Sequence, residues 1–479
     1  MTQVDPEPAQ AGAPGEQRCD LLLTGGCVVT VDEQRRVLDP GAVAIAGDRI
    51  VAVGPASELR DWRAHRIVDC SGRAVIPGLV DCHNHLFQAL VRGLGEGLSI
   101  WPWLCEFMWP YSIAMTPEDA RVAVTLGAIE AVRAGTTTVI DNHYAPTDET
   151  TTLAVAGAIE SVGLRGAVAR GILGKKSPVA ERRGLPDELF RYSTEDELEI
   201  TRNCMTARPP GSRVSVWPAP LNLSYVGQDV LARSVALAAD FSAKWHTHCS
   251  EGQKDPTSYL ESYSIRPVQW LQREGLLDAS ATLAHAIWLD EAEIDHLGEA
   301  RAGTAHNPTS NAYLASGRMA VQELRQRGAC VGLGSDGPSC GHRQDLFECM
   351  KQAVFVQRLY SLDPTSMRCE TALELATREG ARVAGVDAGV LEAGKLADVV
   401  VVRLDAPHLQ PVHRAVATLV YSARGSDVEY TICGGEIVFE NGSCTRVDEG
   451  EAIRRAQEHA RGIVQRTGMT SLCAPWLPA

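Results

Sequence analysis

The sequence lacks the features that nucleic-acid-binding and membrane proteins need. Its formal net charge is −15, and no segment concentrates Lys and Arg, so a basic surface for a phosphate backbone or an anionic membrane is not expected. The longest apolar runs are the size of strands, far below the roughly 20 residues that cross a bilayer. Residues 1–18 are polar and lack the basic start and apolar middle of a secretion signal. We expect these 18 residues to form a disordered tail.

Paired cysteines and nucleotide-binding loops are missing as well. The 14 cysteines are scattered, and no two of them form a C-x-x-C pair. In a long chain without a secretion signal, this usage predicts reduced thiols and a cytoplasmic protein. No G-x-G-x-x-G follows the first strand of the central region, and there is no P-loop. Both absences argue against a doubly wound nucleotide-binding sheet.

The central part of the chain alternates short apolar strands with longer amphipathic segments. Strands are predicted at 75–85, 136–143, 164–170, 214–220, 244–251, 282–287, 303–308 and 330–336. Helices are predicted between them, for example at 117–134, 229–239, 267–274 and 319–327. Eight strand–helix units predict an α/β fold, a (β/α)8 TIM-like barrel over residues 75–390, with an open doubly wound sheet as the alternative.

Both ends of the chain instead have the sequence pattern of short β-strands. Residues 19–74 contain short β-branched runs separated by Gly and Pro turns. After residue 391, strand-like runs return at 397–403, 416–420, 430–432 and 436–442, and a helix is predicted at about 449–466. We therefore expect a small β-sandwich domain built from residues 19–74 and 391–479, with the barrel inserted between its two parts and the helix at its end.

Side chains that can bind metal fall where the predicted barrel strands end. They are His83, His85, His246, His248, Glu251, His285, His306 and Asp336. Barrel enzymes carry their chemistry at this end of the strands, and three histidines with one carboxylate form a set of metal ligands. A bound metal lowers the pKa of water, and a nearby carboxylate can take its proton. The spacing alone leaves open whether His246 or His248 is the ligand.

The motifs resemble those of the amidohydrolase superfamily, in its aminohydrolase branch of deaminases and triazine hydrolases. The resemblance rests on Pro77-Gly-Leu-Val-Asp-Cys-His-Asn-His85, His248-Cys-Ser-Glu251, Ala284-His285, His306-Asn-Pro-Thr-Ser-Asn311, Gly332-Leu-Gly-Ser-Asp336-Gly337 and Gly394-Lys-Leu-Ala-Asp398. It implies one divalent metal, zinc or alternatively Fe2+, on His83, His85, His248 and Asp336. It assigns proton transfer to Glu251, His285 and Asp336. The fourth strand lacks the lysine that bridges two metals in other members, so one metal is expected.

The substrate pocket is where the chain departs from its relatives. The resemblance makes Gln88, Trp103, His143 and Asn311 candidates for substrate binding. Ser112 stands where the thioether-nucleoside deaminases usually carry a glutamate for ribose. The 339–343 loop, Ser-Cys-Gly-His-Arg, also differs from the usual sequence after the metal-binding aspartate. These departures weaken the expectation of an ordinary adenosine-type substrate.

The leading hypothesis is an aminohydrolase that replaces an amino group on a purine-, pterin- or triazine-like heterocycle with oxygen and releases ammonia. The alternative keeps the metal and removes chloride or an alkylamine from a triazine-like ring, or opens a cyclic amide. A remote alternative is a non-catalytic assembly protein on the same barrel. The expected partner is a small heterocyclic substrate, with neither nucleic acid nor membrane, and relatives of this kind are commonly homo-oligomers.

Overall fold

The computed structural model describes residues 17–474. The predicted tail of residues 1–18 lies outside this range except for its last two residues. Gln17 accepts a backbone hydrogen bond of 2.9 Å from Arg63, and Arg18 begins the first strand. Pairing with a neighbouring strand thus satisfies the backbone where the described residues begin.

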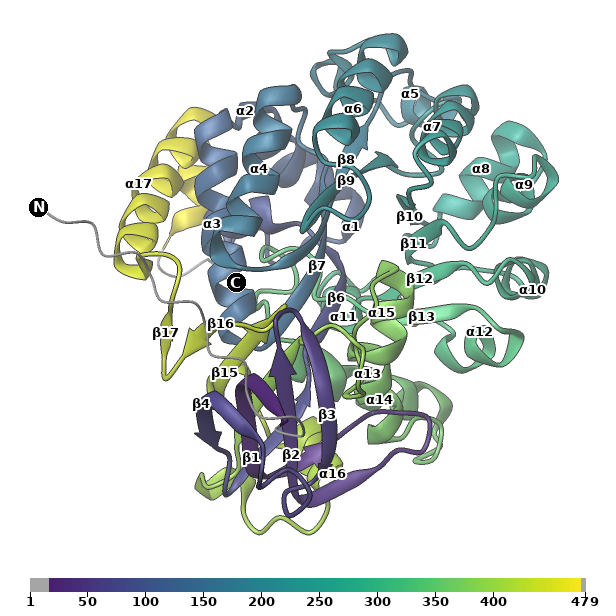
Figure 1. Cartoon of the computed structure of the whole chain (residues 1–479). Helices are drawn as coiled ribbons and strands as arrows, with labels where there is room; N and C mark the ends of the chain where they lie inside the picture. The colour runs from purple at the N-terminus through teal and green to yellow at the C-terminus, as the bar shows by residue number, and fades with distance from the viewer. Residues whose placement is uncertain (1–16, 475–479) are drawn as a thin grey trace, which may run out of the picture.

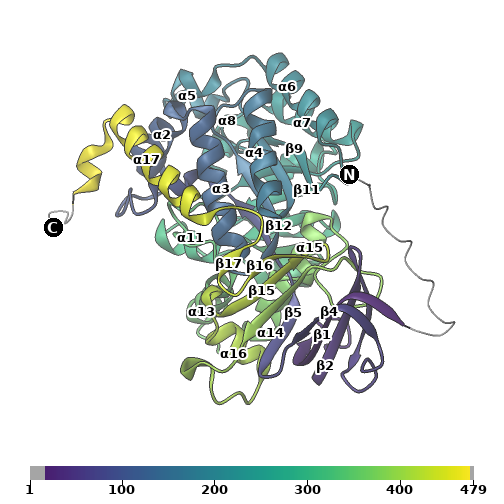
Figure 2. The same cartoon turned by 60° about the vertical axis from the view of Figure 1, so that its left-hand side comes forward.

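Both ends of the chain build one nine-stranded sheet. Its strands are β1 (Arg18–Val29), β2 (Val37–Ala46), β3 (Arg49–Pro55), β4 (Arg63–Asp69), β5 (Arg73–Pro77), β14 (Val399–Arg403), β15 (Val428–Cys433), β16 (Glu436–Glu440) and β17 (Ser443–Cys444). The two groups of strands meet where β5 pairs in parallel with β1 and antiparallel with β14. Figure 2 shows the purple N-terminal strands beside the yellow-green C-terminal ones. The sequence correctly predicted that the two ends come together.

Two elements differ from the sequence-based prediction. The run 75–85 is not one strand, because β5 ends at Pro77 and β6 (Leu79–Asn84) begins a different sheet. Gly78 makes this change of sheet possible, because a Cβ there would lie 2.2 Å from the Thr137 hydroxyl oxygen. The run 416–420 is not a strand but lies in a helix, α16 (Ala415–Tyr421), whose Leu419 and Val420 are buried. A short aliphatic run fits the inner face of a helix as well as a strand.

The central region forms two four-stranded parallel sheets. The first contains β6, β7 (Thr136–His143), β8 (Arg165–Ile172) and β9 (Val214–Pro220), and the second contains β10 (Trp245–Cys249), β11 (Ala281–His285), β12 (Gly303–His306) and β13 (Cys330–Leu333). The sheets meet at both of their ends. Asn222 and His248 form a parallel bridge at one junction, and the Asp336 amide donates to the His83 carbonyl at 3.0 Å at the other.

Helices surround these two sheets (Figure 1). They include α3 (Pro117–Arg133), α4 (Glu149–Val162), α6 (Thr194–Ala207), α7 (Gln228–Asp240), α8 (Asp255–Tyr263), α9 (Pro267–Arg273), α10 (Glu291–Glu299), α12 (Val321–Arg327) and α13 (Leu346–Ser361). The other α-helices of this region are α1 (Ile100–Pro102), α2 (Trp109–Ala114), α5 (Pro178–Arg182), α11 (Pro308–Tyr313), α14 (Cys369–Ala376) and α15 (Arg378–Ala384). The four helices predicted by residue range are present within two residues at each end. Within the described residues, no helix is both long and apolar enough to span a membrane.

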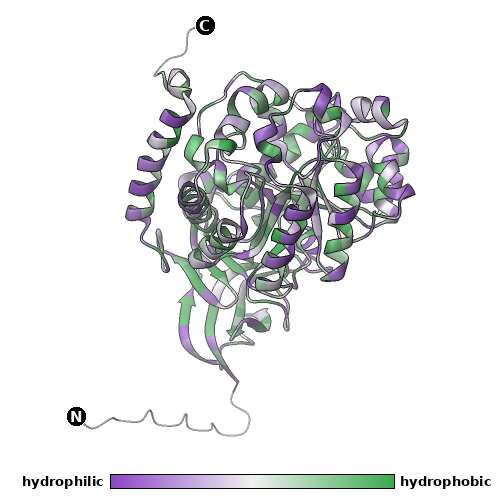
Figure 3. Cartoon of the chain, turned by 90° about the horizontal axis from the view of Figure 1, so that it is seen from above, coloured by the Kyte–Doolittle hydropathy of each residue, from purple (hydrophilic) through white to green (hydrophobic). Residues whose placement is uncertain are grey.

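The last helix, α17 (Glu449–Thr467), lies along α3 and α2 (Figure 2). Most of its residues are hydrophilic (Figure 3), so polar contacts as well as apolar ones hold it. Asp119 on α3 is 1% exposed and accepts a hydrogen bond of 2.7 Å from the His459 Nδ1 of α17, and its other oxygen pairs with Arg466. The helix predicted at 449–466 is therefore present and is tied to α3 by one buried carboxylate.

Candidate active site

The predicted metal-binding side chains converge where the parallel strands end. His83 lies in β6, His248 in β10 and His285 at the last position of β11, while His85 and Asp336 follow β6 and β13. His285 and Asp336 have left-handed backbone conformations, with φ of 69° and 60°. Such strained residues concentrate at functional sites, because the turn aims the side chain where extended backbone would not.

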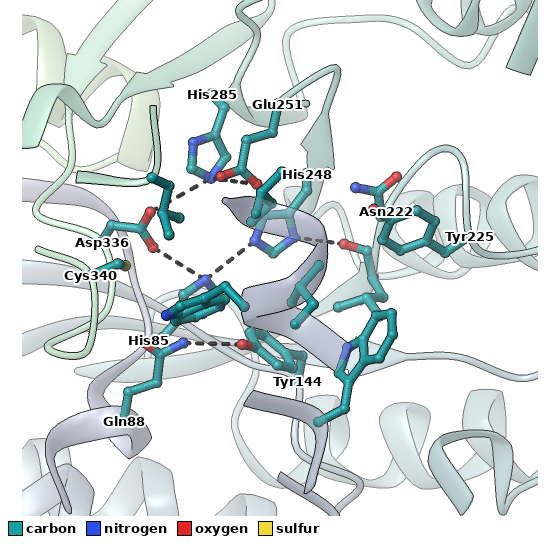
Figure 4. A pocket seen from close by; sticks show the side chains of 16 residues that line it. His85, Gln88, Tyr144, Asn222, Tyr225, His248, Glu251, His285, Asp336 and Cys340 are labelled. Atoms are coloured by element: carbon teal, nitrogen blue, oxygen red, sulfur yellow. Dashed lines mark hydrogen bonds and ion pairs between the residues drawn. The ribbon is translucent and has the colours of Figure 1, made fainter. Parts of the chain in front are cut away.

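Figure 4 shows that His85, His248 and Asp336 face one another, and His83 lies beside them. The Nε2 atoms of His85 and His248 are 3.2 Å apart. Asp336 Oδ1 lies 3.3 Å from His85 Nε2 and 3.5 Å from His83 Nε2. His83 and His85 come from the first parallel sheet, and His248 comes from the second. The ligand atoms of His83, His85 and His248 lie within 4.8 Å of one another, as do those of His83, His285 and Asp336, so this cluster could hold a metal ion.

The Nδ1 atom of each of these three histidines contacts a group outside the cluster. Nδ1 of His85 lies 2.6 Å from the Asn142 carbonyl oxygen, and Nδ1 of His248 lies 2.7 Å from that of Leu221. Nδ1 of His83 instead lies 2.8 Å from Nε2 of His246. Carbonyl acceptors place the proton on Nδ1 and leave the Nε2 lone pair facing the cluster. Of the two histidines on β10, His248 thus belongs to the cluster and His246 lies behind it.

Protonation states and burial fit a divalent metal. Burial lowers the pKa of His83 and His248 well below the usual value, and that of His85 also falls, so all three rings are neutral. Burial alone would raise the pKa of Asp336, but the neighbouring histidines outweigh it and the pKa is well below the usual range. His83 Nε2 is buried without a hydrogen-bond partner. Neutral imidazoles and a carboxylate are the ligands that zinc and similar metals prefer.

A second pair of titratable groups lies beside the cluster. His285 Nε2 is 3.6 Å from Glu251 Oε2 and 3.7 Å from Asp336 Oδ2. Burial raises the pKa of Glu251 to about 7, although His285 partly opposes the shift. Burial disfavours a charged His285, but Glu251 and Asp336 outweigh it and raise the pKa of its ring. Glu251 can therefore gain and lose a proton near neutral pH, which suits a general acid–base catalyst.

A cavity of about 480 Å³, part of it open to solvent, borders this cluster. Gln88 and Trp103, two of the four predicted substrate-binding residues, line it. His143 does not line it, because its ring is buried against that of Phe87, with centroids 4.8 Å apart. Asn311 also lies behind the wall, where its Oδ1 is 2.9 Å from His285 Nδ1. The structure thus places Asn311 as a support for His285 rather than as a contact of the cavity.

Sequence reasoning missed other side chains of the cavity. They include Tyr144, Asn222, Tyr225 and Cys340. Asn222 and Tyr225 follow the end of β9, so the rule that strand ends carry the chemistry could have indicated them. Gln88 is fixed by two contacts, as its Nε2 donates to the Tyr144 hydroxyl at 3.0 Å and its Oε1 accepts from Ser339 at 2.5 Å. The altered 339–343 loop therefore forms part of the wall.

Ser112 has no part in the cavity. Its hydroxyl donates to the Met108 carbonyl at 2.8 Å, and its side chain is buried in α2. The only carboxylates that line the cavity, among the described residues, are Glu251 and Asp336. Beyond this acid–base pair, the cavity wall offers tyrosine hydroxyls and amides.

These features are those of a hydrolase that works with a divalent metal. A family model described as "Amidohydrolase family" matches residues 74–438. The chain belongs to the amidohydrolase family. A second, short match at residues 41–61 is to an imidazolonepropionase-like composite domain of bacteria.

Curated relatives match along almost the whole chain. A 5-methylthioadenosine/S-adenosylhomocysteine deaminase of Syntrophobacter fumaroxidans is 36% identical, covering 94% of this chain and 99% of its own. A protein of the same name from Haloarcula marismortui is 34% identical, with the same two coverages. A 5'-deoxyadenosine deaminase of Methanothermobacter thermautotrophicus is 32% identical, covering 92% of this chain and 98% of its own.

Solved structures share the fold. An adenosine deaminase from Xanthomonas campestris with bound zinc superposes with a TM-score of 0.87 at 27% identity, covering 94% of this chain and all of its own. The atrazine chlorohydrolase of Arthrobacter aurescens TC1 superposes with a TM-score of 0.85 at 24% identity, covering 92% and 100%. The family and its relatives together show an enzyme that hydrolyses carbon–nitrogen bonds.

Proposed function

We propose that the protein is a metal-dependent aminohydrolase that replaces an amino group on a nitrogen heterocycle with oxygen and releases ammonia. The observation that carries this proposal is Glu251. Its pKa of about 7 makes it a proton donor at the cavity wall, 3.6 Å from His285 and beside the metal-binding cluster. Loss of an amine as ammonia needs protons at both the ring nitrogen and the amino group, so this reaction needs such a donor.

His83, His85, His248 and Asp336 would hold the metal, and we propose a single ion, zinc in preference to Fe2+. When bound, a divalent metal lowers the pKa of water so that it can attack at neutral pH. Asp336 is ionised and accepts the proton that the attacking water loses. Glu251 then protonates the ring nitrogen next to the attacked carbon and regains a proton from the newly formed hydroxyl, while Asp336 passes its proton to the amino group, which leaves as ammonia. His285, held by Asn311, stabilises the negative charge that develops there.

The cavity supports a flat aromatic substrate. Trp103, Tyr144 and Tyr225 supply aromatic wall, and Asn222 and Gln88 supply amides. The names of the curated relatives, which refer to adenosine derivatives, support a purine ring over a pterin or triazine. Because no further carboxylate of the described residues faces the cavity, we expect the enzyme to recognise the base more strictly than the sugar hydroxyls.

The alternative reaction, loss of chloride or an alkylamine from a triazine-like ring, uses the same cluster. Chloride leaves without a proton, so an intact Glu251 favours an amine. A non-catalytic assembly protein is a weaker proposal still, because the whole ligand set and both acid–base groups are present and buried together.

Larger-scale features complete the proposal. We propose that the two parallel sheets close into the (β/α)8 barrel and that the nine-stranded sheet is the β-sandwich domain, with boundaries near residues 75 and 390. Hydrogen bonds at both junctions of the parallel sheets support closure. We also propose a cytoplasmic enzyme that acts on a small molecule. The free thiols of all 14 cysteines, which lie in the described part of the chain, agree with that compartment.

Ammonia release by the zinc-loaded protein tests the proposal. The panel contains 5'-substituted adenosines, adenosine, oxidised purines, pterins and aminotriazines, with Asp336→Asn as the inactive blank. We expect release from purine substrates, and a loss of at least about 100-fold in Glu251→Gln, since a general acid contributes 10²–10⁴-fold. Metal content is measured in both variants. A Glu251→Gln variant with full metal and full activity would contradict the role of Glu251, and chloride release without ammonia would support the alternative.

A further inference from the structure

Asp255, the first residue of α8, is a buried carboxylate that the proposed reaction does not use. It is 4% exposed. Its Oδ2 accepts a hydrogen bond of 2.9 Å from the Gly252 amide, and its own amide donates to the Gly252 carbonyl at 2.9 Å. These two bonds close the turn that directly follows Glu251. Burying a carboxylate is costly unless it is paired and hydrogen-bonded, so the partners of this one need an explanation.

Arg183 supplies the opposite charge from a different part of the chain. Its Nη1 lies 3.1 Å from Asp255 Oδ1, and its Nη2 donates to the Ser258 hydroxyl at 3.1 Å. Burial raises the pKa of Asp255, and the charge of Arg183 opposes the rise. Arg183 directly follows α5, so the pair joins the segment after β8 to the segment after β10.

The same guanidinium lies behind the aromatic wall of the cavity. It is 4.8 Å from the centroid of the Trp101 ring and 6.0 Å from that of Tyr225, which lines the cavity. Gly252 packs against this wall as well, because a Cβ there would lie 3.4 Å from Cγ2 of Ile100, another lining residue. The Arg183–Asp255 pair is therefore packed between the turn after Glu251 and the wall of the cavity.

The Glu251 carboxylate itself is held loosely by other side chains (Figure 4). The hydrogen bond and the ion pair that it makes among residues 17–474 are both long, 3.5 Å to Ser316 Oγ and 3.6 Å to His285 Nε2. The backbone on either side must therefore fix its position. Before it, Ser250 has a left-handed conformation, with φ of 46°, and its carbonyl accepts from the Trp288 amide at 3.0 Å. After it, the backbone is fixed by Asp255.

We propose that Asp255 is a positioning residue for Glu251, with Arg183 as its counter-charge. The inference rests on the proposed function, in which Glu251 is the acid–base group. By holding the Gly252 amide, Asp255 keeps the Glu251 carboxylate beside His285 and at the cavity wall. A displacement of about 1 Å in such a group can lower a rate about 100-fold.

A double-mutant cycle of ammonia release tests whether Asp255 acts through Glu251. Asp255→Ala should lower kcat about 10- to 100-fold and leave KM unchanged, because the Gly252 amide loses its acceptor. In a Glu251→Gln background the same change should have almost no further effect on the residual rate, since the group that it positions is already lost. Asp255→Asn keeps an acceptor for the amide and should recover part of the rate. Metal content is measured in every variant.

Asp398→Ala is the matched control. Asp398 is 1% exposed, accepts from the Gly434 amide at 2.6 Å and pairs with Arg165 at 3.3 Å. It therefore has the same burial and the same kinds of partner as Asp255, but it lies next to β14 in the nine-stranded sheet. Its loss should lower stability and leave kcat and KM unchanged.

Amide hydrogen exchange of the zinc-loaded protein tests the placement without a substrate. Exchange in the segment 250–254 should be faster in Asp255→Ala than in wild type, and unchanged in Asp398→Ala. Equal exchange there in wild type and Asp255→Ala would overturn the proposal, as would an Asp255→Ala defect that multiplies fully with that of Glu251→Gln. If the wild type releases ammonia from no compound, the proposed function fails, whereas the exchange rates still decide whether Asp255 holds this segment.

Discussion

His83 differs from its two neighbours in how its ring is held. Nδ1 of His85 and of His248 contacts a backbone carbonyl oxygen, whereas Nδ1 of His83 contacts the side chain of His246. If His83 presents the Nε2 lone pair to a metal, its Nδ1 carries the proton and His246 Nε2 must accept it. Partners of this kind fix the tautomer and orientation of metal-binding histidines.

We therefore expect His246→Phe to weaken metal binding by about 10- to 100-fold, the usual effect of removing such a partner. His246→Gln keeps an acceptor near the same place and should recover most of the affinity. Metal content is measured after dialysis against increasing chelator, with the ammonia-release rate recorded beside it. If His246→Phe holds metal as tightly as wild type, His246 has no such role.

Residue spacing could bring these side chains together because parallel strands place their ends at one edge, and the structure places Asp336 3.5 Å from His83 and 3.3 Å from His85. His83, His85 and Asp336 could be assigned to one site before their distances were known. The cavity wall was harder to predict. Tyr144 and Asn222 enter it from the segments that follow β7 and β9, whose course depends on the packing of the surrounding loops. His143, which was predicted to bind substrate, packs against Phe87, and its neighbour Tyr144 lines the cavity.

At the scale of elements, the contact between α17 and α3 includes one buried carboxylate, Asp119, beside the more exposed pairs Glu118–Arg455 and Arg133–Glu449. Burial raises the pKa of Asp119, but hydrogen bonds from Thr116 and His459 and the charge of Arg466 outweigh it, and the pKa is below the usual value. A carboxyl with a lowered folded-state pKa stabilises the protein above its unfolded pKa of about 4, and this stability is lost as the pH falls through the folded value.

Asp119→Asn should therefore lower the free energy of unfolding at pH 7 by about 1–3 kcal/mol, the range for losing a buried charge-assisted hydrogen bond. The rate of amide hydrogen exchange should rise in α17 and stay unchanged in β10. The variant should also lose part of the wild type's decline in stability below about pH 4. Equal exchange in α17 of both proteins would show that the Asp119 contacts do not hold this helix.

The sequence predicted long amphipathic helices best. It predicted secondary structure least well in apolar runs without a helical or strand periodicity. The helices at 117–134 and 449–466 were placed within a residue or so, because a 3.6-residue pattern fixes both type and extent. The run 75–85 crosses from one sheet to another, and the Pro77–Gly78 pair was its only sequence signal. The aliphatic run 416–420 became a helix because packing against α13 and α14 decided its conformation.

On the scale of the whole molecule, a metal would join the two parallel sheets. His83 and His85 come from the first sheet, while His248 and Asp336 come from the second. A ligand that binds only the folded state stabilises it by about 2.7 kcal/mol when its free concentration is 100 times its dissociation constant.

Removing the metal with a chelator should therefore lower the melting temperature and speed hydrogen exchange at both junctions between the sheets. Restoring zinc should reverse both effects. The Asp336→Asn variant serves as control, since a weakened site should show a much smaller shift on chelation. An equal shift in wild type and variant would place the stabilising metal elsewhere.

The position of β5 also has a consequence for synthesis on the ribosome. Its partner on one side, β1, has already been made when β5 emerges, but its partner on the other side, β14, begins only at Val399. At about 5–20 residues per second, the ribosome leaves the hydrogen-bonding edge of β5 without its partner for tens of seconds. An open strand edge invites pairing with other chains. The nascent chain thus passes through a long interval in which this edge has no partner of its own, until β14 is made.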